Sequence, residues 1–320
     1  MRALPASLAV SLLLAVFSVA PAAAQPVSMA APYEYLGWGD PQPPASVITS
    51  TGVPDLTLAF MLSHGSCNPA WDGKRPLLGG SDAAAIAAIR GAGGDVDVSF
   101  GGWSGKKLGT SCKTVSALAG AYQKVIDAYS LRAIDIDIEH GEVRSKKTRN
   151  RVIEALAQIH AADPKLEITI TFGTEEYGPD AAGRSLIADA VAVGFMPTAW
   201  TVMPFDFGPP QSNMGTASIR SLEGLDADLV AAYGVSAASA YTHIGVSSMN
   251  GHTDESSETV SLEDFQRIVT FAQQKHLERV TFWSVNRDRQ CAGIDSGEDE
   301  CGGITQSPFA FTDVVAGYHG

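Results

Sequence analysis

Residues Arg132-Ala-Ile-Asp-Ile-Asp-Ile-Glu-His140 decide the fold of this chain, because three acids alternate there with three isoleucines. A period of two is typical of a β-strand, in which successive side chains point to opposite faces. The carboxyl groups of Asp135, Asp137 and Glu139 should therefore share one face of the strand. A surface strand with its polar face in water would give the same pattern. The rest of the chain must distinguish a hydrated strand from a site that collects three acids.

Short strand-like segments alternate with helix-like segments along the whole chain. The strand candidates are residues 33–38, 56–62, 96–101, 133–139, 167–172, 200–205, 242–247 and 279–284. Helices are expected at 83–89, 116–129, 148–162, 185–193, 226–233, 265–276 and 312–318. Ser261 and Asp264 have the spacing of a capping box at the start of a helix. Eight strands alternating with helices, without a linker, predict a single α/β domain with the architecture of a (β/α)8 TIM barrel.

The barrel changes the interpretation of the acidic strand. In a parallel barrel the outer face of each strand packs on helices, and the inner face fills the interior. The isoleucines should lie outside and the carboxyl groups inside, where an unpaired charge is costly unless the site uses it. Catalytic groups of such barrels lie at the C-terminal ends of the strands, and Glu139 is the last acid before a loop. The sequence therefore predicts an active site there.

The two ends of the chain and its charge restrict the cellular setting. Residues 1–24 have the layout of a secretory signal peptide: Arg2, an apolar stretch at 8–17 and small residues at 22–24. We expect a secreted, extracellular monomer whose folded domain is residues 25–320. No later stretch approaches the roughly 18–20 apolar residues of a membrane span. The net charge of −13 disfavours nucleic acid and anionic membranes and suits a neutral or cationic ligand.

Two further groups of residues are interpreted without reference to any family. The four cysteines of an exported chain predict two disulfides; three pairings are possible, and we prefer the local pairs Cys67 with Cys112 and Cys291 with Cys301. No Cys-x-x-Cys or His-x-x-x-His spacing occurs, so neither a metal site nor a cofactor is expected. The basic cluster is interpreted as a solvated helix face. It comprises Arg144, Lys146, Lys147, Arg149 and Arg151.

Several motifs resemble those of glycoside hydrolase family 18, the chitinase family. The segment Asp135-Ile-Asp-Ile-Glu139 resembles the last five positions of the family's acidic strand, although Arg132 and Ala133 replace its first Asp and its usual Gly. Three more stretches resemble family motifs in the expected order: Ser99-Phe-Gly-Gly102 with Trp103, Met203-Pro-Phe-Asp206, and Phe282-Trp283-Ser284. Together they span residues 99–288, counting the Asn286-Arg-Asp288 end of the last one.

The resemblance implies a secreted bacterial chitinase that retains the configuration of the sugar. Glu139 would be the general acid and base, and the N-acetyl oxygen of the substrate would attack its own anomeric carbon, since this family is substrate-assisted. Asp137 would orient the acetamido group and stabilise the intermediate. Asp135 would lie deeper and share a proton with Asp137. Neighbouring carboxyl groups would keep Glu139 protonated.

The resemblance also implies a set of substrate-binding residues. They are Gly101, Gly102, Trp103, Met203, Phe205, Asp206 and Trp283. Alternatives remain open: the glycines could serve barrel packing, Trp283 could be a core residue, and Asp206 could cap a loop. Phe205 and Phe207 stand where many members have a tyrosine, and Tyr177 is a possible substitute donor. For most of Tyr33, Tyr35, Trp38 and Phe60 we expect core packing.

Three functions follow from these observations. The first is a chitinase acting on chitin or chito-oligosaccharides, supported by the complete set of acids. The second is an endo-N-acetylglucosaminidase acting on glycoproteins, because that enzyme shares the acidic strand. The third is a chitin-binding lectin that has kept the binding groove and lost catalytic activity. Only Phe205 and Phe207 support this alternative.

Overall fold

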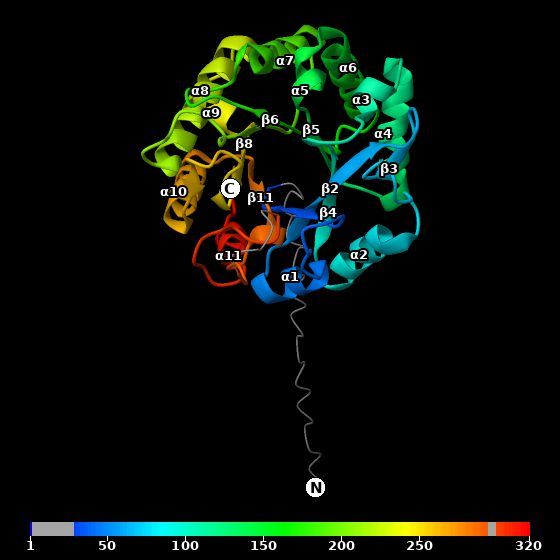
Figure 1. Ribbon diagram of the computed structural model, residues 1–320. Helices are drawn as coiled ribbons and strands as arrows, with labels where there is room; N and C mark the ends of the chain where they lie inside the picture. The colour runs from blue at the N-terminus through cyan, green and yellow to red at the C-terminus, as the bar shows by residue number, and fades with distance from the viewer. Residues whose placement is uncertain (2–28, 294–298) are drawn as a thin grey trace.

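A computed structural model describes residue 1, residues 29–293 and residues 299–320. Eight parallel strands follow one another round a barrel (Figure 1). They are β1 (Tyr33–Tyr35), β2 (Asp55–Ser63), β4 (Asp95–Gly101), β5 (Ala133–Asp137), β6 (Glu167–Gly173), β7 (Ala199–Met203), β8 (Ile244–Met249) and β11 (Arg279–Trp283). A parallel bridge between Ala30 and Val280 joins the last strand to the segment before the first. The predicted single-domain barrel is confirmed, whereas the predicted signal peptide at 1–24 lies, except for Met1, outside the described residues.

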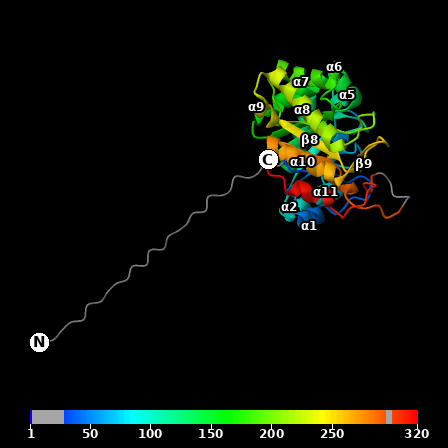
Figure 2. The ribbon, with the colours of Figure 1, turned by 90° about the vertical axis from the view of Figure 1, so that its left-hand side faces the viewer.

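Helices wrap the outside of this barrel (Figures 1 and 2). The longer ones are α1 (Pro44–Thr51), α2 (Gly80–Gly91), α4 (Val115–Tyr129), α6 (Lys146–Ala162), α7 (Ala181–Ala192), α8 (Met214–Tyr233), α10 (Leu262–Lys275) and α11 (Ala310–Ala316). The capping box of Ser261 and Asp264 is present at the start of α10. Helix α8 begins well before the predicted residue 226, because the Asn213 side chain accepts the backbone N–H of Thr216 and caps the helix there.

The structure also contains short helices and strands that the sequence analysis did not predict. They are β3 (Pro69–Trp71), α3 (Leu108–Ser111), α5 (His140–Arg144), α9 (Ala237–Tyr241), the hairpin of β9 (Gly251–His252) and β10 (Thr259–Val260), and the 3-10 turn Val285–Arg287. Helices α3 and α5 and the hairpin follow β4, β5 and β8 directly, so they stand at the C-terminal ends of the strands. Elements this short carry too little periodicity to be found in a sequence.

The isoleucines and acids that alternate along β5 point to opposite faces of the strand, as predicted. Ile134, Ile136 and Ile138 are buried in the hydrophobic core between the strands and the helices. Asp135 points the other way, into the barrel, where it is fully buried. The hypothesis of a hydrated surface strand is therefore wrong, because every residue of β5 is buried in a parallel barrel.

The barrel interior also holds an ion pair that the sequence analysis missed. The Arg279 guanidinium lies 2.7 Å from the Asp97 carboxyl group, and both side chains are 0% exposed. Arg279 also donates to the Thr57 hydroxyl at 2.8 Å, and the Tyr33 ring centre lies 5.7 Å from its guanidinium carbon. Burial raises the pKa of Asp97 to about 6 although Arg279 opposes that rise. The charged form of each residue is thus stabilised by the charge of the other.

The basic cluster is only partly solvated, so its interpretation as an exposed helix face is wrong for two members. Arg149 is buried and lies 2.6 Å from the Asp189 carboxyl group. Arg151 is buried and donates to the Gly109 carbonyl oxygen at 2.6 Å. Arg144, Lys146 and Lys147 are exposed. The two arginines face neighbouring elements because α6 packs on α3 and α7, which a helical pattern alone does not reveal.

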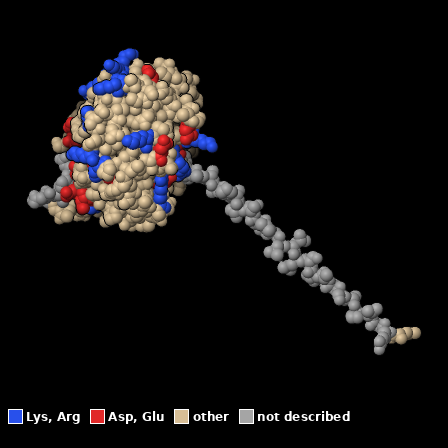
Figure 3. All heavy atoms as spheres, turned by 90° about the vertical axis from the view of Figure 1, so that its right-hand side faces the viewer, with Lys and Arg blue, Asp and Glu red and all other residues tan. Residues whose placement is uncertain are grey.

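The predicted pairing of the four cysteines is confirmed. Cys67 is bonded to Cys112, with their Cα atoms 4.6 Å apart, and Cys291 is bonded to Cys301, with theirs 5.1 Å apart. In the part of the chain that the structure describes, no helix is both long and apolar enough to cross a membrane. On the face shown in Figure 3, acidic and basic side chains are interspersed over a largely uncharged surface.

Candidate active site

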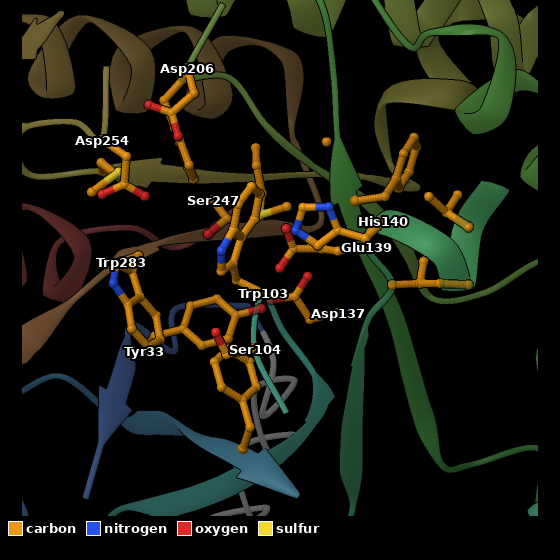
Figure 4. Close-up of a pocket in the computed structure, with 18 of the residues that line it drawn as sticks. Tyr33, Trp103, Ser104, Asp137, Glu139, His140, Asp206, Ser247, Asp254 and Trp283 are labelled. Carbon is orange, nitrogen blue, oxygen red and sulfur yellow. The ribbon is translucent and has the colours of Figure 1, made fainter. Parts of the chain in front are cut away.

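A cavity of about 930 Å³ opens at the C-terminal ends of the barrel strands. Seven of the predicted site residues line it, and Figure 4 shows the carboxyl groups of Asp137 and Glu139 inside it. The seven are Trp103, Asp137, Glu139, Met203, Phe205, Asp206 and Trp283. Asp135, Gly101 and Gly102 are not among the lining residues and lie deeper, in β5 and at the end of β4.

Glu139 lies two residues after the end of β5 and is half-buried at the cavity wall. Burial is the main cause that raises the pKa of its carboxyl group to about 7; the Lys107 ammonium opposes this rise, and the Asp206 and Asp254 carboxyl groups contribute to it. Burial is thus the largest cause, ahead of any neighbouring acid. A carboxyl group that ionises near neutrality can both give and take a proton at physiological pH.

Asp137 is the last residue of β5 and is almost completely buried. Burial raises the pKa of its carboxyl group well above the usual range, and Glu139 and Asp135 raise it further. Among residues 29–293 and 299–320, its Oδ1 atom has no hydrogen-bond partner. A buried polar atom without a partner is costly unless a ligand supplies one. The geometry leaves this oxygen available to a group bound in the cavity.

Asp135 lies below the cavity in a ring of hydroxyl groups. Its Oδ2 atom accepts hydrogen bonds from Tyr33 at 2.7 Å and from Ser99 at 2.6 Å. Its Oδ1 atom accepts from Thr169 at 2.8 Å and from Thr171 at 2.6 Å. Four accepted bonds are the full capacity of a carboxylate. That Asp135 shares a proton with Asp137 stays a prediction.

Gly101, the last residue of β4, and Gly102, which follows it, have a packing reason in this structure. A Cβ atom on Gly101, whose φ is +116°, would lie 2.0 Å from the Asp137 carbonyl oxygen. A Cβ atom on Gly102, whose φ is +78°, would lie 2.6 Å from the Phe60 ring. The absent side chains therefore let β4 approach β5 and Phe60 closely.

Replacing Gly101 with Ala should lower the free energy of unfolding by about 2 to 3 kcal/mol, through strain at positive φ and the clash with β5. Gly91→Ala is the matched control, because no atom lies within 4 Å of a Cβ built there and φ is not positive. Urea unfolding of both variants measures the difference. Equal stability of the two would show that the close approach of β4 to β5 is unimportant.

Aromatic side chains form one wall of the cavity. The Phe60 and Trp283 rings are stacked, with centres 5.5 Å apart and an interplanar angle of 14°. Tyr33 and Tyr35 contact the same group and, with Phe60 and Trp38, also line the cavity, so core packing is not their only role. An aromatic wall of this kind suits the apolar faces of pyranose rings.

Trp103 also lines the cavity. Its side chain is 69% exposed and meets the His140 ring edge to face, with centres 3.7 Å apart. Trp103 follows β4, His140 is the first residue of α5, and both line the cavity together with Glu139. An exposed tryptophan at the cavity offers an apolar surface to a ligand that enters from solvent.

Asp206 combines the two roles that the sequence left open. Its carboxyl group lines the cavity, and its Oδ1 atom also accepts the backbone N–H of Glu255 at 3.0 Å. The loop itself is held by Glu258, whose carboxyl oxygens accept the backbone N–H groups of Asp206 at 2.7 Å and Phe207 at 2.8 Å. Sequence reasoning missed Glu258, because no local pattern marks it as the partner of a loop some fifty positions away, and it also missed Asp254, which lines the cavity.

The hydroxyl group that the phenylalanines lack is not restored by Tyr177. Phe205 lines the cavity, whereas Phe207 is buried and is not a lining residue. Tyr177 is 72% exposed, packs beside Arg220 and is not a lining residue either. Ser247 on β8 does bring a hydroxyl group to the cavity (Figure 4).

Comparison with known proteins gives a consistent result. No protein-family model matches the chain. It is 28% identical over 291 residues to the probable bifunctional chitinase/lysozyme of Escherichia coli strain K12, covering 85% of this chain and 32% of that protein. It is 27% identical over 254 residues to endochitinase 11 of Metarhizium anisopliae, covering 74% of this chain and 48% of that protein. The chain therefore spans about a third to a half of the length of these curated relatives.

Solved structures extend the comparison to three dimensions. The catalytic domain of the hyperthermophilic chitinase from Pyrococcus furiosus is 27% identical, with a TM-score of 0.82, covering 92% of this chain and 98% of that one. Catalytic-site mutants of active domain 2 of the Pyrococcus furiosus chitinase, complexed with chito-oligosaccharides, are 27% identical with a TM-score of 0.81. The match covers 91% of this chain and 94% of that one.

The parallel barrel has the fold of these solved chitinases, and its acids lie at the end of one strand beside an aromatic-walled cavity. The sequence motifs, the relatives and the solved structures agree. The chain is similar to chitinases in sequence and in fold over most of its length.

Proposed function

We propose that the protein hydrolyses β-1,4 linkages of N-acetylglucosamine in chitin or chito-oligosaccharides, with Glu139 as general acid and base. The observation that carries this proposal is the position of Glu139 at the end of β5, facing the cavity with a pKa of about 7 beside the buried Asp137. The acid is available to the substrate and is protonated where the first step needs a proton.

The reaction would proceed in two steps. Glu139 gives its proton to the glycosidic oxygen while the acetamido oxygen of the same sugar bonds to the anomeric carbon, and the bond to the leaving group breaks. Glu139, now ionised, then takes a proton from a water that attacks the anomeric carbon and opens the ring intermediate. Each displacement inverts the centre, so the product keeps the starting configuration.

Asp137 would serve the acetamido group in both steps. Its partner-free Oδ1 atom can accept the acetamido N–H, which directs the acetamido oxygen toward the anomeric carbon. The charge that the nitrogen gains in the intermediate strengthens this hydrogen bond. Asp135, through its hydroxyl ring, would hold the strand that positions Asp137.

The aromatic wall would bind the sugar rings. Trp283, supported by the stacked Phe60 ring, is the candidate floor beneath the sugar that reacts. Met203, Phe205 and Asp206 would contact the same sugar from β7 and its loop. Action outside the cell is part of the proposal, because two disulfides persist in oxidising compartments.

Of the alternative functions, neither gains a supporting observation. A fungal endo-β-N-acetylglucosaminidase has a similar fold, but its identity of 15% and TM-score of 0.57 speak for the barrel alone. A lectin without chemistry would not need Glu139 and Asp137 together at the cavity with raised pKa values.

The test is release of a fluorescent leaving group from di- and tri-N-acetylglucosamine conjugates by the mature protein, followed by product analysis on colloidal chitin. We expect release from both conjugates and short oligomers from chitin. Release of glycans from a high-mannose glycoprotein without action on chito-oligomers would favour the endo-N-acetylglucosaminidase. Binding of chito-oligomers without any product would establish the lectin.

The pH dependence of kcat/KM should follow the ionisation of Glu139 in the free protein. Because the acid must carry its proton, kcat/KM should fall as pH rises through about 7, the pKa of Glu139. Well above that pH the loss should approach about tenfold per pH unit. Initial rates on the trimer conjugate between pH 5 and pH 9, in buffers of constant ionic strength, measure it. A rate constant independent of pH across this interval would contradict the assignment.

A further inference from the structure

Lys107 lies in the loop between β4 and α3 and is almost completely buried. Its ammonium group donates to the carbonyl oxygens of Gly101 at 3.1 Å, Ser104 at 2.5 Å and Gly102. An ammonium group has three N–H donors, and a neutral amine has only two. The three donated bonds therefore require the charged form and use all of its donors.

The three carbonyl groups belong to one segment, residues 101–104, which leads from β4 into the cavity. Gly102 at its start donates its N–H to the Asp137 carbonyl oxygen at 2.9 Å, and Trp103 in its middle stands at the rim. Lys107 thus fixes a turn that joins the strand of the acids to an aromatic side chain of the site. It acts through backbone atoms, not by touching a sugar.

The charge of Lys107 acts on the carboxyl groups around it. It lowers the pKa values of Glu139, Asp137 and Glu142, in each case against the effect of burial. Burial in turn lowers the pKa of Lys107, and these three acids oppose that shift. The cation and the acids therefore stabilise one another's charged forms.

Glu142 on α5 completes this arrangement from the other side. Its carboxyl group is buried, accepts the backbone N–H of Gly109 on α3, and has a pKa of about 7. Arg151 on α6 donates to the Gly109 carbonyl oxygen at 2.6 Å. Lys107, Glu139 and Glu142 all line a second hollow of about 640 Å³ next to the main cavity. Lys107 thus places a buried positive charge near the proposed acid Glu139. Neither a disulfide nor the barrel core accounts for a cation at this position.

We propose that Lys107 is a positioning residue of the hydrolytic site: it fixes the 101–104 segment against β5 and supplies the positive charge against which Glu139 gives up its proton. The proposal rests on the hydrolysis proposed above. Without this charge, only acids would act on the ionised form of Glu139 that ends the first step. The Glu139 carboxyl group would then hold its proton too tightly to give it to the glycosidic oxygen.

Charged groups on every neighbouring element contribute to the balance. Glu139, Asp137, Lys107 and Glu142 shift one another's pKa values, and Lys107 also shifts that of His140. Further charged groups that shift a pKa within this set are Asp135, Asp206, Asp254, Arg144 and Arg151. Arg144 and Arg151 affect His140 and Glu142 respectively, and Lys107 is the cation that acts on both Asp137 and Glu139. A change in the ionisation of Glu139 on removing Lys107 is therefore specific to that residue.

The experiment compares Lys107→Met with Lys107→Arg and with Lys106→Met. Lys106 is the matched control, because it is the next residue and carries the same charge but is exposed and donates to the Gly65 carbonyl oxygen. In Lys107→Met the fall of kcat/KM at alkaline pH should move up by about one pH unit. Lys107→Arg and Lys106→Met should keep the wild-type position. A role in folding alone would lower stability and rate in Lys107→Met without moving the pH profile, and that result would overturn the proposal.

A second readout does not depend on hydrolysis. The Glu139 carboxyl carbon, labelled with carbon-13 and assigned by its loss in Glu139→Gln, can be titrated by NMR in wild type and in Lys107→Met. A higher midpoint in the variant supports the proposal even if the protein hydrolyses none of the conjugates, which would count against the proposed function alone. Equal midpoints overturn it. Should Lys107→Met not fold, Lys107→Gln makes the same comparison, and failure of both to fold would assign Lys107 to the fold and overturn its role in the site.

Discussion

Glu139→Gln should reduce hydrolysis of the di- and tri-N-acetylglucosamine conjugates by about 10²- to 10⁴-fold, the usual contribution of a general acid. The amide keeps the size of the side chain and cannot protonate the glycosidic oxygen. Glu139 has no fixed role in the barrel core, since it follows β5 and faces the cavity, so the fold should be unchanged. The expected loss lies in kcat, and binding of chito-oligomers should remain.

The matched control is Glu223→Gln, because Glu223 is an exposed residue of α8 that does not line the cavity. Initial rates with both conjugates, together with calorimetric titration of a chito-oligomer, separate catalysis from binding. Full activity of Glu139→Gln would remove Glu139 from the mechanism. Loss of binding together with loss of rate would instead indicate that the carboxylate holds the sugar.

Arg279→Met should lower the free energy of unfolding by about 3 to 5 kcal/mol, because it leaves the Asp97 carboxyl group buried without its cation. Both side chains are 0% exposed, so water cannot replace the lost partner. The loss should be larger at pH 7 than at pH 4. Burial raises the pKa of Asp97 in the folded protein above its unfolded value, and Arg279 opposes that rise. Removing Arg279 therefore raises this pKa further, so the variant loses more stability than the wild type as pH rises.

Two further variants sharpen the test, with urea unfolding as the measurement. Arg267→Met removes an exposed arginine that lies 3.7 Å from Glu263 on α10, and it should cost less than about 1 kcal/mol. The double variant Arg279→Met with Asp97→Asn removes both charges and should recover part of the loss. If Arg279→Met were no more harmful than Arg267→Met, the buried pair would not contribute to stability.

Both predictions concern charges inside a barrel whose interior is unusually polar. Asp97 and Arg279 lie low in it, Asp135 and its four hydroxyl partners lie above them, and Asp137 and Glu139 lie at the mouth. Water access increases in the same order, from complete burial at Asp97 to half-burial at Glu139. Glu139, the proposed general acid, is thus the most accessible of the four acids to water.

Sequence alone determined the architecture and the identity of the acids. The period of two on β5 assigned isoleucines and carboxyl groups to opposite faces, and eight alternating strands and helices predicted the closed barrel that exists. The local cysteine pairs were also predicted correctly. These features are encoded by residues close in the sequence, because strand period, helix caps and short loops are local properties of the chain.

Only the tertiary structure decided which polar groups are partners. Arg279 and Asp97 are separated by 182 positions, and Tyr33 and Asp135 by 102, so nothing local relates them. For the same reason the sequence placed Arg149 and Arg151 in solvent and did not find Lys107 or Glu258. A periodic pattern tells which face a side chain occupies, whereas barrel closure decides what stands opposite it, and that opposite group determines whether a buried charge is neutralised, paired or left to act on a substrate.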